Sequence, residues 1–490
     1  RLPSRLSRRA RLAVAGGVAA LAVLVAPLVS TRPGDGDRAL TSAVPRRWNV
    51  VVIVSDDERY DDDRTMRRVR RLLAAHGVTF TDFNVTTSEC CPSRASILTG
   101  QYSHHHHVIG NFGHTGYPSF DESNTVATWL SRRGYTTALV GKYLNAYSIY
   151  GHHHVPPGWA RWVAMDTVPE ERFYRYTLNV QGRLHHRGRK PTDYSTTVLT
   201  GYAKRFLEHA REPFFLYFTP IAPHLPAIPA PVDVRSLRAL PTARSPSFDE
   251  ADISDKPWHA WHERRLSANG IDYVNDEIRR RRLESLRAVD RSVGQLVRTL
   301  RRRGDLDRTV IFYLSDNGFL LGEHRLGGKI WPYAESTHVP LVVRTPWSAR
   351  ARRDRHPVLN IDLASTIAQL AAVRPGRPQD GTSLVPLLHG RRPPWRTDFL
   401  EEYRGDPLVN VGGPPRFTAV RDERYLYVEY DNGWRELAVS SEHAVATLSL
   451  PQVHKDPFDR ILIAQAVVDG YSLLTSDDVV ARYPGDILLV

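Results

Sequence analysis

Cysteine, methionine and lysine are scarce in this chain of 490 residues. The two cysteines, Cys90 and Cys91, are adjacent, and adjacent cysteines cannot join distant parts of a fold, so a disulfide framework is excluded. Low-complexity sequence and internal repeats are also missing. The length allows one large α/β domain and a smaller unit, and a hydrophobic content of 41% supports a sizeable core, which excludes a disordered chain.

The shortage of lysine leaves arginine to carry most of a formal net charge of +13. Lysine occurs only at positions 142, 190, 204, 256, 329 and 455. A basic chain of this kind suits nucleic acid, an anionic polymer or a membrane surface, and a sulfated polysaccharide fits equally well. Charge alone therefore selects no partner.

The first thirty residues have the pattern of an export signal. Arg5, Arg8 and Arg9 precede an apolar run from Leu12 to Val29. The tripeptide at positions 7–9 suggests a twin-arginine signal. The alternative is an uncleaved anchor helix, because the apolar run is marginal for a membrane span. We expect residues 1–30 to be a signal peptide or anchor, residues 31–47 to be a linker, and the main body to be secreted or otherwise outside the cytoplasm.

Apolar runs of strand length alternate with helical stretches along the main body. The runs cover residues 49–54, 135–140, 213–218, 309–314 and 340–343. The clearest helix spans about 276–303, where Leu283, Leu286, Val293 and Leu300 share one apolar face. This alternation predicts an α/β fold with a largely parallel, doubly wound sheet.

Polar residues follow four of the predicted strands. They are Asp56 and Asp57 after the first, Lys142 after the second, His224 after the third, and Asp316 and Asn317 after the fourth. Because the carboxyl ends of parallel strands lie along one sheet edge, these side chains should converge. Three carboxylates and an amide oxygen suit Ca²⁺ or Mg²⁺. Asp and Asn are also ordinary turn residues, which is the alternative for any one pair.

The segment Cys90-Cys91-Pro92-Ser93-Arg94, followed by Thr99-Gly100, matches the signature C-x-P-S-R and T-G of the sulfatase family. In that family the first cysteine is oxidised by a formylglycine-generating enzyme, and the hydrated aldehyde is the nucleophile. The resemblance places formylglycine at Cys90 and leaves Cys91 as the variable position. The alternative is a pair of buried structural thiols.

The resemblance covers about residues 48–437. Within the family, the chain is similar to the N-acetylglucosamine-6-sulfatase branch in segments such as 141–145 and 154–159. It implies an alkaline-phosphatase-like fold, with a mostly parallel sheet flanked by helices. Residues 48–400 would form the catalytic domain. Residues 401–437 would be the remnant of a small antiparallel subdomain that is truncated or replaced.

The family pattern also implies a role for each matching residue. Asp56, Asp57, Asp316 and Asn317 would hold Ca²⁺ together with the modified Cys90. Arg94 would hold the hydrated aldehyde, and Lys142, His224 and Lys329 would contact the sulfate and its leaving oxygen. Taken singly, each lysine could be a surface residue and His224 a structural side chain.

Three further residues are expected substrate contacts. Asn145 stands near a position where many sulfatases have histidine, and His107 and His154 end two histidine runs, at 104–107 and 152–154. Such runs can bind transition metals. We favour loops at the rim of the pocket, because neighbouring histidines cannot all face one ion.

The last part of the chain, residues 438–490, departs from the sulfatase pattern. Segments such as 450–460 and 474–477 resemble the end of a PIN-domain ribonuclease toxin, with Asp459 and Asp477 at its late acidic positions. The early acidic positions of that family have no counterpart here. We therefore expect a PIN-like fragment without ribonuclease activity, and no nucleic-acid partner.

The sequence predicts hydrolysis of sulfate monoesters through formylglycine and Ca²⁺, with 6-O-sulfated N-acetylglucosamine or a related glycan as substrate. A phosphate or phosphonate ester hydrolase on the same scaffold is the enzymatic alternative. An inactive secreted protein that binds glycans is a second alternative, and an RNA-binding protein or nuclease is a third.

Overall fold

The computed structural model describes residues 47–490, except for 167–171, 238–239, 241–244, 255, 258–259, 261–262, 406–412, 432–438, 454, 476 and 490. Two units were distinguished, residues 1–44 and 45–490. The predicted export signal and nearly all of the predicted linker lie outside the described residues. Within the described part, no helix is long and apolar enough to cross a membrane.

A ten-stranded mixed sheet forms the centre of the main body. Its strands, in spatial order, are β13 (Arg352–Asp354), β2 (Gly77–Phe80), β12 (Leu341–Arg344), β9 (Thr309–Ser315), β1 (Asn49–Ser55), β8 (Phe214–Thr219), β4 (Thr136–Gly141), β5 (Arg161–Met165), β6 (Thr177–Val180) and β7 (Arg183–His186). The strands β9, β1, β8, β4 and β5 are parallel to one another. This confirms the largely parallel sheet, whereas β12 is antiparallel to both of its neighbours.

The central strand β1 is buried on both faces, which explains its continuous run of valine and isoleucine. Val50, Val52 and Val54 contribute to one hydrophobic core, and Val51 and Ile53 contribute to the other. The two cores lie on opposite faces of the sheet because successive side chains of a strand alternate.

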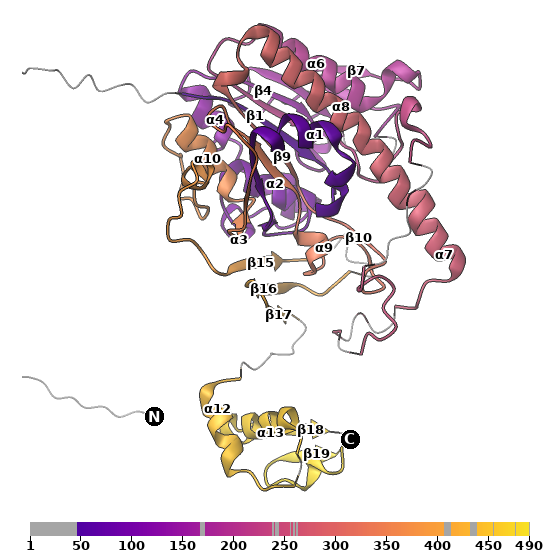
Figure 1. The fold of residues 1–490 in the computed structure, drawn as a ribbon, viewed down its shortest axis with the longest axis vertical. Coiled ribbons are helices and arrows are strands. Elements are labelled where there is room, and N and C mark those ends of the chain that lie inside the picture. The colour runs from indigo at the N-terminus through magenta and orange to yellow at the C-terminus, as the bar shows by residue number, and fades with distance from the viewer. Residues whose placement is uncertain are drawn as a thin grey trace, which may run out of the picture. The chain divides into compact units, whose positions relative to one another are not determined.

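Helices cover both faces of the sheet (Figure 1). On one face lie α2 (Cys90–Thr99), α4 (Val126–Arg132) and α10 (Asp362–Leu370), whose apolar residues belong to the first core. On the other face lie α1 (Arg67–Leu72), α6 (Ser195–His209) and α8 (Arg280–Arg303). The fold is therefore a three-layer α/β/α arrangement, as the alternation of strands and helices predicts.

The helix predicted at 276–303 is present but begins later. α8 starts at Arg280 and is preceded by a π-helical turn, η8 (Tyr273–Arg279), and by α7 (Ala268–Asp272). Leu283, Leu286 and Val293 are buried, as predicted. Sequence periodicity does not distinguish a π-helical turn from the first turn of an α-helix, because both place apolar residues on a similar face.

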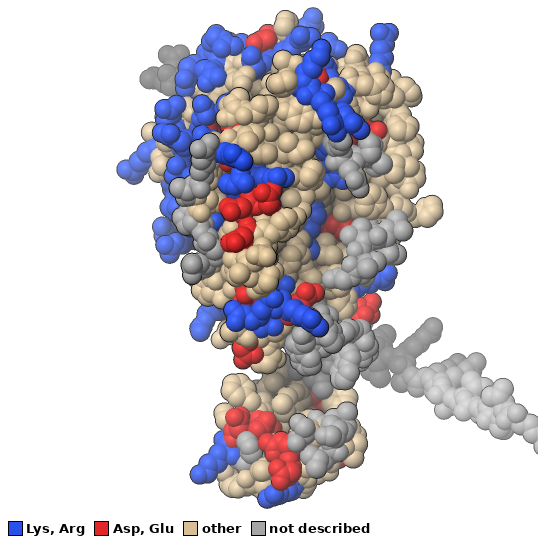
Figure 2. All heavy atoms as spheres, turned by 90° about the vertical axis from the view of Figure 1, so that its right-hand side faces the viewer, with Lys and Arg blue, Asp and Glu red and all other residues tan. Residues whose placement is uncertain are grey.

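Shorter elements complete the main body. The helices are α3 (Ser103–His106), α5 (Tyr147–Gly151), α9 (Ala334–Thr337) and α11 (Val385–Leu388), and the two-stranded ribbons are β3 (Phe83–Asn84) with β14 (Val358–Leu359) and β10 (Leu320–Leu321) with β11 (Gly327–Gly328). The space-filling view in Figure 2 shows Lys and Arg side chains spread over the visible face of this body, with acidic side chains in smaller groups.

A small antiparallel sheet follows the main body, as predicted. It consists of β15 (Phe399–Tyr403), β16 (Phe417–Arg421) and β17 (Leu426–Tyr430). Tyr403, Phe417 and Tyr430 form its core, together with Ile330 from the segment that carries Lys329. The sheet thus packs directly beside a predicted catalytic residue.

The end of the chain forms a separate small core. α12 (Ser441–Ala446) packs on α13 (Pro457–Asp469), and β18 (Leu473–Thr475) pairs in parallel with β19 (Ile487–Leu489). Ile463 of α13 is buried with Val480 and Tyr483 in a cluster that contains residues of this region only. Ile487 of β19 packs against the same cluster, so α13 and β19 both contribute to a local core.

Candidate active site

The turn after β1 places two carboxylates at one point. Asp56 and Asp57 are buried, and Asp57 has a left-handed backbone with φ 71°. Asp tolerates this conformation better than most residues. The turn interrupts the alternation of the strand, so that both carboxylates lie near Cys90. The Asp57 backbone N–H donates to Asp316 Oδ1 at 3.0 Å, which joins the ends of β1 and β9.

The helix α2 explains the spacing of the cysteine motif. Cys90 is its first residue and Arg94 lies one turn later, so both side chains project from the same face. Pro92 lies in the first turn, where a missing N–H costs no helical hydrogen bond. Cys91 projects away into the hydrophobic core, while its backbone N–H donates to Asn111 Oδ1. Only Cys90 therefore faces the carboxylates.

Cys90 lies among acidic and basic groups from three segments: the turn of Asp56 and Asp57, the end of β4 with Lys142, and the loop with Lys329. Its Sγ is 3.6 Å from Asp56 Oδ1 and 3.9 Å from Asp57 Oδ1. Lys329 Nζ lies 2.6 Å from Cys90 Sγ and 2.6 Å from Asp57 Oδ1. Lys142 Nζ lies 2.7 Å from Asp56 Oδ2. The residues predicted from four strand ends and from the cysteine motif do converge.

Arg94 is fully buried and connects three parts of the site. Its Nε donates to Asp316 Oδ2 at 2.7 Å, and one terminal nitrogen donates to the Lys142 carbonyl at 3.0 Å. Its other terminal nitrogen is 3.6 Å from Asp56 Oδ2. Burial by itself would lower the pKa of Arg94, but Asp316 and Asp56 raise it further than burial lowers it. Arg94 is thus a permanent buried cation.

The three carboxylates differ in their electrostatic surroundings. Burial alone would raise the pKa of Asp56, but Lys142, His224 and Arg94 outweigh it and hold the pKa well below its usual range. Burial likewise opposes Lys329 and His224 at Asp57, whose pKa falls to about 2. At Asp316 burial prevails over Arg94 and raises the pKa. Asp56 and Asp57 are consequently ionised at neutral pH.

Burial also sets the charge of the neighbouring groups. Burial raises the pKa of the Cys90 thiol to about 12, and Lys142 and Lys329 reduce this effect only in part. The unmodified thiol is therefore protonated at neutral pH. Burial would lower the pKa of Lys329, but Asp57 and Cys90 more than compensate and raise it. Lys329 remains a cation in the site.

His224 lies at the outer side of the cluster. Its Nδ1 is 2.6 Å from the Leu225 carbonyl, so Nδ1 carries the proton, and Nε2 accepts from Arg172 at 3.0 Å. Nε2 is also 3.7 Å from Asp57 Oδ2. Burial lowers the pKa of His224 to about 4, and Asp57 and Asp56 offset only part of the effect. The imidazole is therefore neutral in the free site.

Arg172 is a site residue that the sequence analysis missed. It stands in no motif, and its only signal is its contact with His224 in the folded structure. Both residues line a cavity of about 510 Å³. The cavity is also lined by Leu225, Pro226, Tyr273, Glu277, Ile278 and Arg281. It is an opening of suitable size and polarity for part of a sugar beside His224.

The sequence also did not predict that Arg282 of α8 contributes to the site, because Arg282 belongs to an arginine-rich stretch that has the pattern of a solvated helix face. In the structure it is fully buried and donates to the backbone carbonyls of Asp57 and Pro223. It therefore holds the Asp57 turn and the His224 loop against the long helix. This places Arg282 behind the site as a support.

The donor atoms fit a hard divalent cation. Ligand atoms of Asp56, Asp57, Cys90 and His224 lie within 4.8 Å of one another, and this is the one such group found among the described residues. Asn317 Oδ1 is buried without a hydrogen-bond partner, while Asn317 Nδ2 donates to Asp57 Oδ1 at 2.7 Å. A buried amide oxygen beside carboxylates is a ligand of the type that Ca²⁺ prefers.

The three expected substrate contacts have different positions. Asn145 is buried, and its backbone N–H contacts the Cys91 thiol. His107 is exposed at the end of α3, with a left-handed backbone. His154 is paired with Glu122 at 2.6 Å. Among the described residues, no hydrogen bond or ion pair joins these three side chains to the carboxylate cluster, and their roles stay predictions.

The first histidine run is helical, which corrects the expectation of a loop. Positions 103–106 form α3, and three of the four histidines have partners: His104 contacts Glu402, His105 contacts Asp380 and His106 contacts Ser96. The run therefore ties α3 to its surroundings. Sequence reasoning could not detect this, because the partners come from distant segments.

Comparison with known proteins was made on sequence and on structure. A family model described as Sulfatase matches residues 48–373, and one described as N-sulphoglucosamine sulphohydrolase, C-terminal, matches residues 322–441. The N-acetylglucosamine-6-sulfatase of Homo sapiens is 35% identical over 382 residues, which cover 74% of this chain and 69% of that protein. The Extracellular sulfatase SULF-1 homolog of Drosophila melanogaster is 33% identical over 384 residues, 75% of this chain and 34% of that protein.

Among solved structures, one determined in complex with its substrate D-glucosamine-2-N,6-O-disulfate superposes with a TM-score of 0.64 at 22% identity. The match covers 80% of this chain and 90% of that chain. At this identity the likeness concerns the fold, and it agrees with the predicted alkaline-phosphatase-like arrangement. The resemblance of residues 438–490 to a PIN domain rests on the sequence alone and stays a prediction.

Proposed function

The chain belongs to the sulfatase family and is a sulfuric ester hydrolase, and from this premise we propose that it acts through a formylglycine derived from Cys90 and a bound Ca²⁺. The observation that carries the proposal is the position of Cys90. It begins α2 between two ionised carboxylates and Lys329, with Arg94 one turn later on the same face. A formylglycine-generating enzyme would be needed during maturation.

We propose a 6-O-sulfated N-acetylglucosamine, or a related glycan, as the substrate. The human relative is named for this activity, and it is 35% identical to the chain. The cavity beside His224, lined by Arg172 and Arg281, supports this choice because it combines cationic groups with the aromatic ring of Tyr273. Asn145, His107 and His154 remain candidates for further sugar contacts.

Formylglycine would supply a nucleophilic oxygen, and Ca²⁺ would supply positive charge toward the sulfate oxygens. Asp56, Asp57, Asp316 and Asn317 would hold the ion. Arg94 keeps Asp56 and Asp316 in place through its buried contacts. The protein's own contribution is thus a rigid set of donors whose charges are fixed before substrate arrives.

The cations of the site are placed to stabilise charge on a sulfate ester. Lys142 pairs with Asp56, and Lys329 pairs with Asp57. His224 is held by the Leu225 carbonyl so that Nε2 faces the cluster. In the free site His224 is neutral and Nε2 is unprotonated, so His224 would have to take up a proton on Nε2 after substrate binds before it acts as the candidate proton donor to the departing sugar oxygen.

Charge balance explains why the site needs a divalent ion to attract an anion. Three carboxylates face three cations, Arg94, Lys142 and Lys329, and His224 is neutral. The protein groups alone leave little net charge when the carboxylates are ionised. A bound divalent cation would add two positive charges in a buried place, where an anionic sulfate is stabilised strongly.

We further propose an extracytoplasmic location. The basic and apolar pattern of residues 1–30 supports it, and the related Drosophila melanogaster protein is named an extracellular sulfatase. The proposed organisation is an export segment at 1–30, a linker at 31–47, a catalytic domain at 48–400, its antiparallel subdomain at 401–437, and a PIN-like fragment at 438–490.

Peptide mass analysis of the Cys90 segment tests the formylglycine proposal. Active protein should carry the aldehyde at Cys90 and an unchanged thiol at Cys91. Cys90→Ala should abolish turnover while the fold remains. The matched variant Cys91→Ala should keep measurable activity. A fully active preparation with an unmodified Cys90 thiol would contradict the proposal.

Substrate choice requires a separate comparison. We expect higher kcat/KM on 6-O-sulfated N-acetylglucosamine than on a simple aryl sulfate, because only the sugar can use the cavity beside His224. Matched sulfate and phosphate esters should show a preference for sulfate. Equal efficiency on the sugar and the aryl sulfate would remove the support for a sugar-specific pocket.

A further inference from the structure

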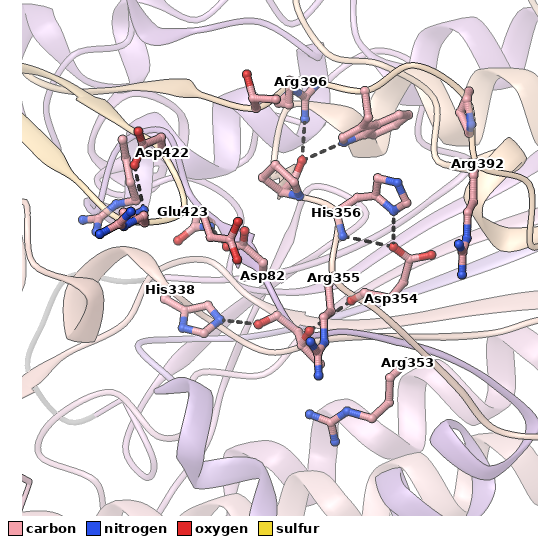
Figure 3. Close-up of a pocket in the computed structure, with 18 of the residues that line it drawn as sticks. Asp82, His338, Arg353, Asp354, Arg355, His356, Arg392, Arg396, Asp422 and Glu423 are labelled. Atoms are coloured by element: carbon pink, nitrogen blue, oxygen red, sulfur yellow. Dashed lines mark hydrogen bonds and ion pairs between the residues drawn. The ribbon is translucent and has the colours of Figure 1, made fainter.

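A second, larger cavity lies outside the site described above. It has a volume of about 1350 Å³ and contains none of the proposed catalytic or metal-binding residues. We call it the basic groove, and it is lined by residues 81, 82, 84, 334, 338, 352–357, 390–393, 395–397 and 421–424. Figure 3 shows that these side chains come from several separate segments around one opening.

Arginine dominates the lining of the groove. Arg396 and Arg421 are already paired with Asp362 and Glu401, respectively. Arg424 is exposed beside the ring of Tyr425, and four further arginines, Arg353, Arg355, Arg391 and Arg392, are exposed as well. None of these four forms an ion pair with any residue that the structure describes, and Figure 3 shows Arg353 and Arg392 extending without a drawn contact. These guanidinium groups are therefore available to an anionic ligand.

The four acidic residues of the groove, Asp82, Asp354, Asp422 and Glu423, are outnumbered by the eight arginines that line it, so positive charge is in excess. Asp354 is mostly buried and accepts from His356 at 2.6 Å. Asp82 accepts from Asn84 at 2.6 Å, and Asp422 accepts two backbone N–H groups of the turn that follows it. Hydrogen bonds inside the protein thus occupy three of the carboxylates, while the four arginines face solvent.

The groove shares a sheet edge with the active site. The order β13-β2-β12-β9-β1 places β13 three strands away from β9. β2 and β13 run in the same direction as β9, so Asp82 and Arg355 follow strand ends on the same edge as Asp316. With neighbouring strands about 4.8 Å apart, the two strand ends are separated by roughly 14 Å along the edge.

We propose that the basic groove is a second binding site for a linear sulfated polysaccharide, which holds the polymer while one of its sugars is in the active site. Planar guanidinium forks match the oxygens of sulfate groups, and several of them in one groove suit a repeating anion. Trp395 lines the same opening and offers an apolar surface beside the charges. The inference rests on the proposed function for its choice of sulfated glycan over other polyanions.

Binding to heparin, measured by calorimetry with the full chain carrying Cys90→Ala, tests the groove without any turnover. Arg391→Ala with Arg392→Ala should weaken binding about tenfold or more, and Arg353→Ala with Arg355→Ala should do the same. The control pair Arg70→Ala with Arg71→Ala removes the same charge from exposed positions of α1 outside the groove. It should change affinity by less than about twofold.

Equal losses in the groove and control pairs would overturn the proposal, because they would indicate non-specific attraction to a basic surface. Tighter binding of duplex DNA than of heparin at the same salt concentration would also overturn it in favour of a nucleic acid. In active enzyme, the double variants at positions 391 and 392 and at positions 353 and 355 should raise KM for the polymer and leave KM for the sulfated monosaccharide unchanged. Groove-dependent binding without hydrolysis of any sulfate ester would refute the proposed function and not the groove.

Discussion

His106 shows how one residue of a histidine run is used inside the protein. Its Nδ1 accepts from the Val108 backbone N–H at 3.1 Å, so Nε2 carries the proton and donates to Ser96 Oγ at 3.0 Å. A second proton would remove the Nδ1 acceptor. Burial, with a smaller effect of Arg377, lowers the pKa of His106 to about 3. The neutral imidazole is therefore part of the folded state.

This pKa predicts a loss of stability in acid. The unfolded chain takes up the His106 proton near its ordinary pKa of 6.5, while the folded chain resists until about pH 3. Stability from this group is thus complete above pH 6.5 and falls as the pH decreases through that window, by up to about 1.4 kcal/mol per pH unit.

Urea unfolding at pH 7 and pH 5 checks this expectation. The stability difference between the protein and its His106→Gln variant should shrink by about 2 kcal/mol between the two pH values. His153→Gln replaces an exposed histidine and serves as the control, with no such pH-dependent difference expected. A difference for His106→Gln that is the same at both pH values would contradict the argument.

Replacement of Asn317 best distinguishes a role as a metal ligand from a purely structural role. Its buried Oδ1 has no hydrogen-bond partner, so the expected ligand role predicts that Ca²⁺ stabilises the folded protein. Ca²⁺ at about 100 times its dissociation constant should add about 2.7 kcal/mol to the free energy of unfolding. The Asn317→Ala variant should lose most of this gain.

A buried asparagine with a purely structural role provides the control. Asn179 Nδ2 donates to the Tyr147 hydroxyl at 2.7 Å, away from the carboxylate cluster. Asn179→Ala should lower the melting temperature in chelator but keep the Ca²⁺-dependent rise. If chelated protein and Ca²⁺-loaded protein melt at the same temperature, the calcium assignment has to be dropped.

Individual site residues were predictable where a motif or a strand end marked them. Cys90 and Asp56 carry such a mark, and they come together as expected. Arg172 and Arg282 have none, because arginine is common throughout the chain and only folding separates a buried arginine from a solvated one. The periodicity of apolar residues does not predict polar contacts between distant segments, such as that of Arg172 with His224.

At the scale of elements, the close approach of β4 and β8 determines where Lys142 lies. Gly141 ends β4 with φ 130°, and a Cβ there would lie 2.1 Å from the Thr219 carbonyl oxygen. The same carbonyl accepts the Lys142 backbone N–H at 2.8 Å. A side chain at Gly141 would therefore separate the two strands at the point where they carry catalytic groups.

Gly141→Ala should cost about 3 kcal/mol of stability or more, from the combined clash and backbone strain, and should reduce kcat. Gly201 provides the opposite case, since it lies exposed inside α6 and a Cβ there would meet nothing within 4 Å. Gly201→Ala should stabilise by up to about 1 kcal/mol. Guanidinium unfolding of both variants measures the two changes in stability. If Gly141→Ala does not lower the stability, the argument that β4 and β8 are too close for a side chain at position 141 is wrong.

Elements with a strong hydrophobic period were predictable, and short polar ones were not. The strand β1 was expected at 49–54 and extends by one residue to Ser55. β7 covers Arg183–His186, where three of the four side chains are exposed and Leu184 is the one apolar residue, so no apolar pattern marks it. Its strand pairing with β6 comes from backbone hydrogen bonds, which the side-chain pattern does not encode.

For the whole molecule, the question is whether residues 442–490 contribute to catalysis. All proposed catalytic and metal-binding residues lie between Asp56 and Lys329, and the two cores of the central sheet end at Leu388. The small core of Ile463, Val480 and Tyr483 contains residues of the last region only. We therefore expect this region to fold around its own core.

Deletion of residues 442–490 should leave kcat/KM for the sulfate ester unchanged within about 0.5 kcal/mol, because this region has its own core and shares no residue with the proposed site. It should also remove exposed apolar side chains such as Leu448 and Phe458, which are 84% and 76% exposed, and so reduce self-association in light scattering. The full chain should cleave no RNA, with or without Asp459→Asn and Asp477→Asn, since two carboxylates are too few to position a scissile phosphate. Metal-dependent RNA cleavage that is lost in this double variant, or loss of sulfatase turnover on deletion, would show that the region has a function of its own.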